Sequence, residues 1–340
     1  MVTIKDIARE LNLSYATVSL ALNDSPLVNK ETAKKVKEVT QKMGYRPNAM
    51  ARGLVLRRSG IIGIIVPEIS NPFFASVARG AEEAAVKRGF NLLICNTDWR
   101  NELESQHLRL IQEKMVDGLI IVSIDSKNQV LEELIEQNWP LVFASSSYPN
   151  SDLSFVGVDS MRGGYLVGRH LADLGHTKIA FVGGMLNSES VRSRYSGFKK
   201  ALEERGIDFD EALILEGSFS IESGYRNASV LTKKFPGVTA AFAADDLIAI
   251  GMIKAFKELS VPMPEKFSIV GYDDIFISEL PGIELTTVFQ EKQLMGKLAA
   301  NLLLDQIDTD EQSFSEQKRI IRLAPRLIVR NTTGPAPQLN

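Results

Sequence analysis

Two pairs of adjacent carboxylates stand out as groups that could carry acid–base chemistry. Asp245 and Asp246 follow the apolar run AAFAA, and Asp273 and Asp274 end the stretch FSIVGYDD. Two carboxyl groups that face one another can serve as general acid and general base. The side chains of adjacent residues diverge, however, so neither pair is a good candidate for catalysis. Asp245 and Asp273 could instead cap the helices that follow them.

Motifs for metal, nucleotide or acyl-transfer chemistry are missing from the sequence. The single cysteine, Cys95, lies in the apolar run NLLICN, where a buried strand residue is expected, so no internal disulfide or cysteine-based zinc site can form. The three histidines, His107, His170 and His176, show no HxxxH spacing. No GxGxxG follows the first strand, and neither a P-loop motif nor GxSxG occurs. We therefore expect no enzyme activity, no metal and no cofactor.

Positive charge is concentrated at the amino terminus. The whole chain has a formal net charge of −3, which alone argues against nucleic-acid binding. Residues 1–58, however, hold eleven Lys and Arg against five Asp and Glu, whereas residues 59–340 carry a net charge of −9. A small basic module on an acidic body is expected when one part of a protein meets phosphate. A solvated helical face explains such a segment about as often, so charge alone leaves the question open.

Three short helices are predicted within residues 1–45. Thr3 and Asp6 have the spacing of a capping box, and apolar residues then recur at helical spacing to Leu11. Ser14 can cap a second helix after a tight turn, and Asn29 can cap a third that ends near Gly44. This arrangement is typical of a helix-turn-helix, whose second helix enters the major groove of DNA.

The outward face of the second helix carries no charged side chain. Tyr15 and Ser19 could reach phosphates or base edges, while Ala16 and Leu20 could contact a thymine methyl group. As a generic three-helix bundle this segment would be weak evidence for DNA binding, so the detailed residue string matters.

That string resembles the headpiece of the LacI/GalR family. The segments IKDIARELNLSYATVSLALN and TAKKVKEVTQKMGYRPNAMARGL match nearly every fixed position of the family pattern over about fifty residues. One departure is Leu20, where the family usually has Arg, and Leu cannot make a bidentate guanine contact. The operator sequence therefore stays open. The DNA-binding residues that the resemblance implies are Thr3, Ser14, Tyr15, Ala16, Thr17, Ser19, Leu20, Asn29, Asn48, Ala51 and Leu54.

Residues 46–59 resemble the hinge of the same family. In that family two hinge helices, one per subunit, pair in the minor groove and wedge a leucine into the central base step, and Leu54 holds that position here. Gly53 lowers intrinsic helicity by roughly 1 kcal/mol, as expected for a helix that forms only on DNA. The alternative is a plain linker that contains one apolar residue.

From Gly60 onward, apolar runs alternate with amphipathic stretches. Continuous apolar runs indicate strands covered on both faces, and therefore parallel sheets in an α/β fold. A break near Asp159 divides them into two doubly wound halves. The strand-like runs are 61–67, 91–95, 118–122, 140–144, 155–159, 178–184, 240–244 and 267–273, and the helical stretches are 72–88, 101–115, 127–138, 160–174, 190–205, 221–234 and 245–259.

The body also resembles the effector-binding core of the LacI/GalR family, in VDGLI, KIAFVGG, SGYRNA, FAADDLIAIG and FSIVGYDD. The resemblance implies a periplasmic-binding-protein-like fold with a ligand between two subdomains, lined by Phe73, Phe74, Asp159, Ser190, Arg194, Phe219, Asp245 and Asp273. Carboxylates, an arginine and flat aromatic rings suit a polyhydroxylated ligand. One of Phe73 and Phe74 could equally be an ordinary residue of the hydrophobic core.

The predicted fold is therefore an all-α headpiece joined to an α/β core of two doubly wound parallel-sheet subdomains. The boundaries are a headpiece at 1–45, a hinge at 46–59, a core at 60–330 and a polar tail at 331–340 that we expect to be disordered. Within the core, the first subdomain takes about 60–159 and 290–320, and the second about 160–289 and 321–330.

The sequence thus predicts a cytoplasmic DNA-binding transcription regulator, most simply a repressor controlled by a sugar or sugar derivative. We expect a homodimer on a palindromic operator, because two-fold proteins read two-fold sites. No membrane partner is expected, since no apolar run approaches the roughly 20 residues of a membrane helix. The alternatives are control by a purine, a nucleoside or a phosphocarrier protein, and, more remotely, a sugar-binding protein without a DNA function.

Overall fold

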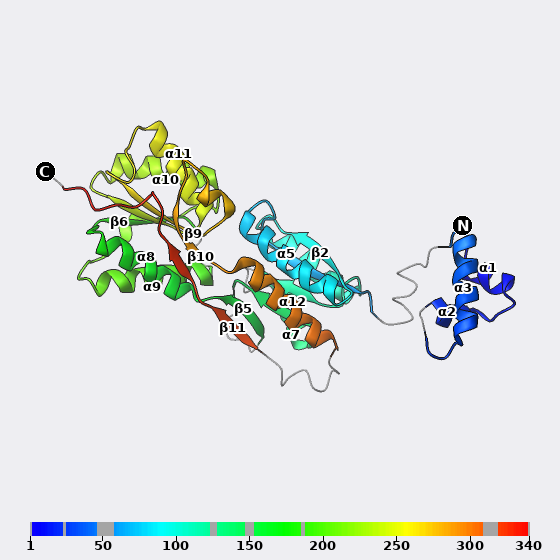
Figure 1. Ribbon diagram of the computed structural model, residues 1–340. Helices are drawn as coiled ribbons and strands as arrows, with labels where there is room; N and C mark the ends of the chain where they lie inside the picture. The colour runs from blue at the N-terminus through cyan, green and yellow to red at the C-terminus, as the bar shows by residue number, and fades with distance from the viewer. Residues whose placement is uncertain are drawn as a thin grey trace. The chain divides into compact units, whose positions relative to one another are not determined.

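The computed structural model describes residues 2–22, 25–45, 58–122, 128–146, 153–184, 188–308 and 319–338. The chain divides into two units, Met1–Ser59 and Gly60–Asn340, which are considered separately (Figure 1). The predicted hinge helix, with Asn48, Ala51 and Leu54 as candidate DNA contacts, lies outside the described residues.

The headpiece contains the three predicted helices, α1 (Ile4–Glu10), α2 (Tyr15–Leu22) and α3 (Lys30–Lys42). Their start points follow from the caps. The Thr3 amide donates to Asp6 Oδ2 at 2.9 Å, Thr17 N donates to Ser14 Oγ at 3.0 Å, and Thr32 N donates to Asn29 Oδ1 at 2.7 Å. The helices enclose a small core of Ile7, Ala8, Val18, Ala21 and Val36.

A six-stranded parallel sheet forms the first subdomain of the core, in the order β11-β5-β4-β3-β1-β2. Alternate residues of one strand pack on opposite faces: Ile64 belongs to the cluster under α5 and α12, and Ile65 to the cluster under α6 and α7. The elements are β1 (Ile61–Val66), α5 (Pro72–Lys87), β2 (Asn91–Asn96), α6 (Asn101–Gln112), β3 (Leu119–Ile121), α7 (Gln129–Glu136), β4 (Leu141–Ala144), β5 (Ser154–Val158), α12 (Lys292–Asp308) and β11 (Ile320–Leu323).

The second subdomain repeats this plan with a sheet in the order β12-β10-β9-β8-β6-β7. Five strands are parallel, which confirms the predicted parallel-sheet fold, and the edge strand β12 runs antiparallel to β10. The elements are α8 (Ser160–Asp173), β6 (Ile179–Val182), α9 (Glu189–Glu203), η1 (Glu211–Leu213), β7 (Ile214–Leu215), α10 (Ile221–Lys234), β8 (Ala240–Ala243), α11 (Asp246–Glu258), β9 (Ser268–Asp273), η2 (Phe276–Glu279), β10 (Thr286–Phe289) and β12 (Arg326–Ile328).

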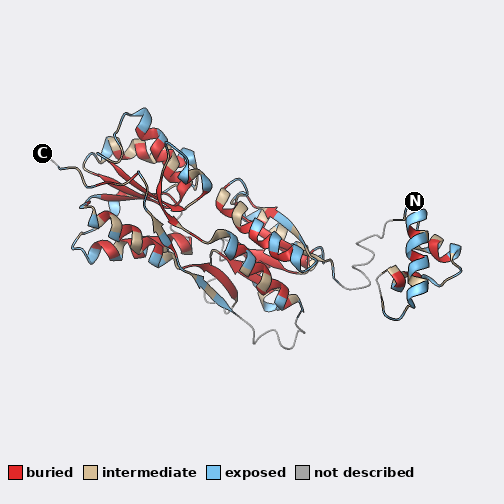
Figure 2. Cartoon of the chain, viewed as in Figure 1, coloured by how far each residue is buried: buried red, intermediate tan, exposed pale blue. Residues whose placement is uncertain are grey.

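The chain crosses three times between the two subdomains. It leaves the first sheet after β5, returns between β10 and α12, and passes from β11 to β12. Figure 1 shows α12 returning to lie beside α5, far from it in sequence. Buried residues fill the central strands of both sheets, whereas edge strands such as β2 and β11 are partly exposed (Figure 2). Three short connections therefore join the subdomains, an arrangement typical of proteins whose domains close about a hinge.

Glycines let α8 and α9 approach unusually closely. A Cβ added at Gly164 would overlap the carbonyl group of Arg194, and one at Gly197 would overlap that of Met161. The same reciprocal arrangement joins α5 to α12, where Gly80 and Gly296 face backbone atoms of the partner helix. Arg194 is therefore held on a helix whose distance from its neighbour is fixed by backbone contact.

Two predicted boundaries need correction at the carboxyl end. β11 pairs with β5, so the first subdomain extends to Leu323 instead of ending at 320. The tail is not disordered over residues 331–338. Thr332 is 5% exposed and exchanges hydrogen bonds with the backbone of Ile269, and the Gly334 carbonyl accepts from the fully buried His176. The polar composition of the tail was misleading because its polar groups bond to the core.

None of the described helices combines the length and the apolar surface needed to span a bilayer.

Candidate functional site

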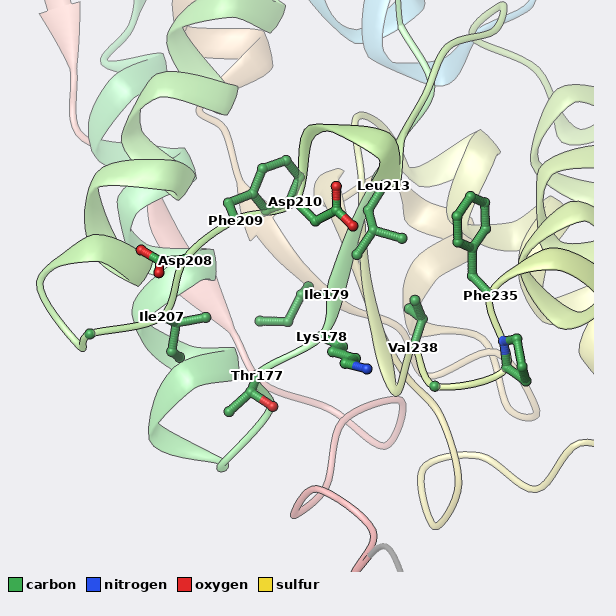
Figure 3. A pocket seen from close by; sticks show the side chains of 13 residues that line it. Thr177, Lys178, Ile179, Ile207, Asp208, Phe209, Asp210, Leu213, Phe235 and Val238 are labelled. Atoms are coloured by element: carbon green, nitrogen blue, oxygen red, sulfur yellow. The ribbon is translucent and has the colours of Figure 1, made fainter.

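Two cavities among the described residues of the core bear on function, and the described lining of the larger one includes no buried polar side chain. It has a volume of about 610 Å³ and lies at the amino ends of β6 and β8 (Figure 3). Phe209, Phe235 and Val238 contribute apolar walls, while the charged residues at its edge, such as Lys178 and Asp208, are exposed to solvent. Ligands of open α/β sheets bind at the carboxyl ends of the strands, so this cavity is at the wrong end of the sheet.

The smaller cavity lies at the carboxyl ends of the strands, between the two subdomains, and has a free volume of about 50 Å³. Side chains from both subdomains line it, and we call it the inter-subdomain cavity. Its lining residues are Pro67, Asn71, Phe73, Phe74, Trp99, Val122, Ser145, Ser146, Ser188, Ser190, Arg194, Phe219, Asp245 and Asp273.

A continuous aromatic wall closes one side of this cavity. Phe73 and Phe74 begin α5 and meet edge to face at 5.1 Å between ring centroids, and Phe74 contacts Trp99 at 6.2 Å. Trp99 then stacks on Phe219 at 5.1 Å with an interplanar angle of 17°. Because Trp99 belongs to the first subdomain and Phe219 to the second, this stack joins the two across the cleft.

Arg194 is a buried cation whose donors are only partly used. Its side chain, on α9, donates from Nη1 to the Ala244 carbonyl at 2.5 Å, and the guanidinium lies 3.8 Å from the centroid of the Tyr272 ring. Nη2 is 4.0 Å from Asp273 Oδ1. Nε is buried and has no hydrogen-bond partner among the described residues. The burial of a charge with an open donor is costly unless a ligand completes it.

Asp245 and Asp273 oppose this cation from the ends of β8 and β9. Asp245 caps α11 through Oδ1, which accepts from Ile248 N at 2.8 Å, while its Oδ2 is buried with no partner in the described part of the chain. Asp273 Oδ1 accepts from Gln290 Nε2 at 2.5 Å. Burial raises the pKa of both carboxyls, that of Asp273 to about 6, although Arg194 partly opposes the effect. Capping and ligand binding are therefore compatible at Asp245.

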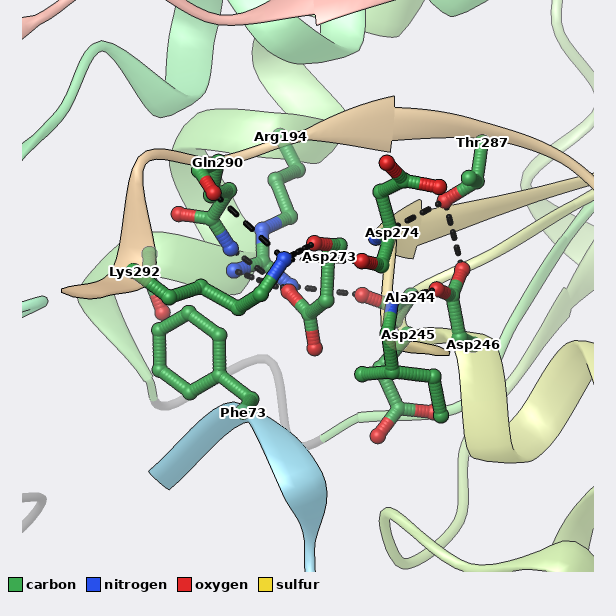
Figure 4. A network of polar contacts seen from close by, with 12 residues as sticks. Phe73, Arg194, Ala244, Asp245, Asp246, Asp273, Asp274, Thr287, Gln290 and Lys292 are labelled. Carbon is green, nitrogen blue, oxygen red and sulfur yellow. Dashed lines mark hydrogen bonds and ion pairs between the residues drawn. The ribbon is translucent and has the colours of Figure 1, made fainter. Parts of the chain in front are cut away.

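The adjacent carboxylates point elsewhere, as the sequence predicted (Figure 4). Asp246 is fully buried and accepts from Thr287 Oγ1 at 2.5 Å, from Ser278 Oγ and from Ile275 N, and burial raises its pKa to about 7. Asp274 forms an ion pair with Arg330 at 2.7 Å. Neither adjacent pair therefore places two carboxyl groups face to face as an acid and a base. Among the described residues, no group of His, Cys, Asp or Glu side chains could hold a metal ion.

Seven of the eight predicted effector residues line the inter-subdomain cavity, and Asp159 does not. Asp159 instead caps α8, where Oδ1 accepts from Arg162 N at 2.9 Å. Sequence reasoning missed Asn71, Trp99, Ser145, Ser146 and Ser188 among the lining residues. Trp99 could have been suspected because it follows the end of β2, but Ser145 and Ser146 lie in loops without a recognisable pattern.

The candidate DNA contacts of the headpiece fall into two groups. Tyr15 and Leu20 are 50% and 38% exposed on α2, Ala16 is exposed, and Ser19 is half-buried. The second group lies at helix amino termini, where backbone amides favour phosphate. It consists of Thr3, Ser14, Thr17 and Asn29, with Ser14 Oγ and Thr17 Oγ1 hydrogen-bonded to each other at 2.8 Å.

Family models match both units of the chain. Residues 3–48 match the model of bacterial regulatory proteins of the lacI family, and residues 59–328 match the model of periplasmic binding proteins and the sugar-binding domain of the LacI family.

Individual relatives agree with these models. The HTH-type transcriptional repressor PurR of Haemophilus influenzae is 34% identical over 98% of both chains. A LacI family regulator from Enterococcus faecium, solved with bound ribose, is 34% identical with a TM-score of 0.73 over 81% of this chain and 99% of that one. The Lac repressor dimer bound to operator is 27% identical with a TM-score of 0.85 over 98% and 99%.

The buried carboxyl of Asp273 makes stability depend on pH. Its pKa is raised above the ordinary value of 3.8 to about 6, so the folded state holds the proton more tightly than the unfolded state. Its contribution to stability is complete below pH 4 and is lost as the pH rises through about 6. We expect Asp273→Asn, which never ionises, to gain stability relative to wild type over that interval.

Urea unfolding of wild type and Asp273→Asn at half-unit steps from pH 4 to 8 measures this difference. Asp208→Asn, at an exposed position, is the control and should follow wild type. A constant difference between Asp273→Asn and wild type across this range would contradict the assignment of a raised pKa to Asp273.

Proposed function

Because the chain belongs to the LacI family of bacterial regulatory proteins, we propose that it is a repressor controlled by a sugar that binds in the inter-subdomain cavity. It is a DNA-binding transcription regulator with a small-molecule effector, like the relatives described above. Those relatives are regulators and not enzymes, and we propose the same for this chain. Since its target is the bacterial chromosome, we assign it to the cytoplasm.

The observation that carries the proposal is a pair of buried atoms, Arg194 Nε and Asp245 Oδ2, that have no hydrogen-bond partner among the described residues and belong to residues lining one cavity. A sugar hydroxyl accepts from the first and donates to the second. The aromatic rings of Phe73 and Phe219 then offer flat surfaces to the C–H faces of the sugar ring. The cavity offers one guanidinium beside two carboxyl groups and therefore no surplus positive charge for a phosphate, so we assign a neutral sugar and not a sugar phosphate.

The cavity must open to admit such a ligand. Its volume of about 50 Å³ is well below the roughly 300–1,000 Å³ of pockets that hold small molecules. Entry therefore requires separation of Trp99 from Phe219 or rotation of one subdomain about the three crossings. A ligand that favours one of these arrangements shifts the population toward it. In a dimer, that shift would alter the spacing of the two headpieces and hence the affinity for DNA.

A second candidate ligand is a purine or nucleoside. The observation that favours it is the aromatic wall of Phe73, Trp99 and Phe219, whose rings could stack on a planar base as well as on a sugar. Both candidates leave the regulator assignment unchanged.

We propose that the regulator acts as a homodimer on a palindromic operator, as the likeness to the operator-bound Lac repressor dimer supports. Two exposed apolar surfaces suit contact with a second copy. Leu93 and Ile94 are 36% and 46% exposed on the edge strand β2, and Phe276 and Leu280 are 65% and 44% exposed around η2. Within the headpiece, Tyr15, Ala16 and Leu20 are the proposed base selectors, while Asn48, Ala51 and Leu54 remain proposals from the sequence.

Ligand screening by thermal shift and calorimetry tests the effector assignment. We expect a neutral sugar such as D-ribose to stabilise the full-length protein, by about 2.7 kcal/mol at a hundredfold excess over Kd, and ribose 5-phosphate to have no effect. Arg194→Gln should lose at least tenfold in sugar affinity, because a neutral amide cannot replace the oriented guanidinium donors. Lys200→Gln, on the exposed face of the same helix, is the matched control.

Stabilisation by purines alone would select the second candidate. Stabilisation only by phosphorylated sugars, or a sugar affinity unchanged in Arg194→Gln, would remove the neutral-sugar proposal.

Selection of duplexes from a random DNA library tests the proposed base selectors of the headpiece. Wild type should enrich a palindrome without a strong guanine preference opposite Leu20, because leucine offers only apolar contact. Leu20→Arg should gain a preference for guanine at one position in each half-site, worth about 1–3 kcal/mol. Leu27→Arg, at an exposed residue of the same unit outside α2, should leave the selected sequence unchanged. Identical sequences from wild type and Leu20→Arg would exclude Leu20 as a selector.

A further inference from the structure

Lys292 occupies a position that local helix physics disfavours. It is the first residue of α12, and a cation at a helix amino terminus opposes the helix dipole by about 0.3–1 kcal/mol. The side chain is also half-buried, which costs solvation free energy for an ammonium group. A residue that breaks local preferences must gain its stabilisation from contacts elsewhere.

Those contacts cross from the first subdomain to the second (Figure 4). Lys292 Nζ donates to the carbonyl oxygens of Asp273 at 2.5 Å, Asp274 at 2.8 Å and Gln290 at 3.4 Å, and it lies 5.2 Å from the centroid of the Phe289 ring. Three acceptors match the three donors of an ammonium group. The side chain therefore joins the start of α12 to the carboxyl end of β9, beside one of the crossings between subdomains.

The segment that Lys292 holds is strained. Asp273 has φ 115° and Asp274 has φ 52°, in a region that residues with side chains rarely adopt. Each such residue costs on the order of 1–3 kcal/mol and persists only where surrounding contacts hold it. Lys292 supplies two of those contacts through the backbone carbonyls, and Gln290 supplies a third through the Asp273 carboxylate.

The same backbone conformation determines where the Asp273 carboxylate lies. Asp273 lines the inter-subdomain cavity, with Oδ1 4.0 Å from Arg194 Nη2, whereas Lys292 does not line it. A change in the angle between the subdomains moves the ammonium relative to β9, because Lys292 and Asp273 belong to different subdomains. Any effect of Lys292 on a ligand must therefore pass through Asp273.

We propose that Lys292 is a positioning residue that sets effector affinity by fixing the backbone and carboxylate of Asp273 across the hinge. This inference rests on the proposed function, because it takes the inter-subdomain cavity as the effector site. The arrangement makes the orientation of one ligand-binding carboxylate depend on the closure of the two subdomains. Lys292 is thus a link between ligand recognition and domain movement that contacts no ligand itself.

The test compares Lys292→Met, which keeps the apolar stem but removes the donors, with Lys292→Arg, which retains them. Lys297→Met, at an exposed position of the same helix, is the control. Hydrogen exchange of the full-length protein without ligand measures directly how stably the segment that begins at Asp273 is held. Amides 273–278 should exchange at least tenfold faster in Lys292→Met than in wild type, with recovery in Lys292→Arg and no change in Lys297→Met. Lys292→Gln serves if Lys292→Met does not fold.

Calorimetry with D-ribose from pH 5 to 8 separates positioning from a merely structural role. We expect Lys292→Met to bind ribose at least tenfold more weakly than wild type. The pH below which binding weakens should rise, since a positive charge near the Asp273 carboxyl is lost, and Lys292→Arg should restore both properties. Unchanged exchange in Lys292→Met, or faster exchange with unaltered ribose affinity and pH profile, would overturn the proposal.

These results are separable from a failure of the proposed function. If wild type binds no ribose, the sugar assignment fails, while the exchange data still decide whether Lys292 holds the Asp273 segment. A second titration series, with adenine as the probe, then decides the positioning role by the same comparison of the three variants.

Discussion

The burial of one guanidinium group and two carboxyl groups at the meeting point of two sheets is the constraint on which the core depends. Each of these groups loses water, and each is only partly compensated by the protein. Arg194 donates to the Ala244 carbonyl and lies over the Tyr272 ring. Asp245 accepts a hydrogen bond from the first turn of α11, and Asp273 accepts one from Gln290. An unpaired buried donor or acceptor costs about 1–3 kcal/mol. In the proposed function, a ligand that completes these bonds would recover that free energy and so favour closure of the subdomains.

Such a site requires rigid secondary-structure elements to position its charged groups. The close contact of α8 with α9 at Gly164 and Gly197 fixes the helix that carries Arg194, and the parallel strands β8 and β9 deliver the two aspartates to one edge. The hinge must allow movement at the same time, because the cavity, at about 50 Å³, is far smaller than a pocket that holds a small molecule. The structure separates these demands: regular elements position the charges, while the three crossings and the Trp99–Phe219 stack are the parts that can move.

The sequence predicted the elements well where periodicity was strong and poorly where it was weak. Helices such as Pro72–Lys87 and strands such as Ile61–Val66 differ from the prediction by about a residue, because long apolar patterns and caps leave few alternatives. The strands β7, β10, β11 and β12 were missed, since runs of two to four residues carry little periodicity. The prediction of a disordered tail was wrong, because composition cannot reveal that Thr332 donates a hydrogen bond to the Ile269 carbonyl.

Prediction of the site depended on a different kind of information. Resemblance led to seven residues that the structure gathers around one cavity, yet it also suggested Asp159, which caps a helix outside it. Trp99 offered only the weak signal of its place after β2, and the contacts of Lys292 could not be predicted, because they join segments distant in sequence. The central claim remains the coupling of this cavity to DNA, and reciprocal linkage measures it directly. Operator affinity by fluorescence anisotropy with and without saturating effector, and effector affinity with and without operator, should change by one common factor, typically 5–150-fold. An effector that binds the cavity while operator affinity stays constant would contradict the account.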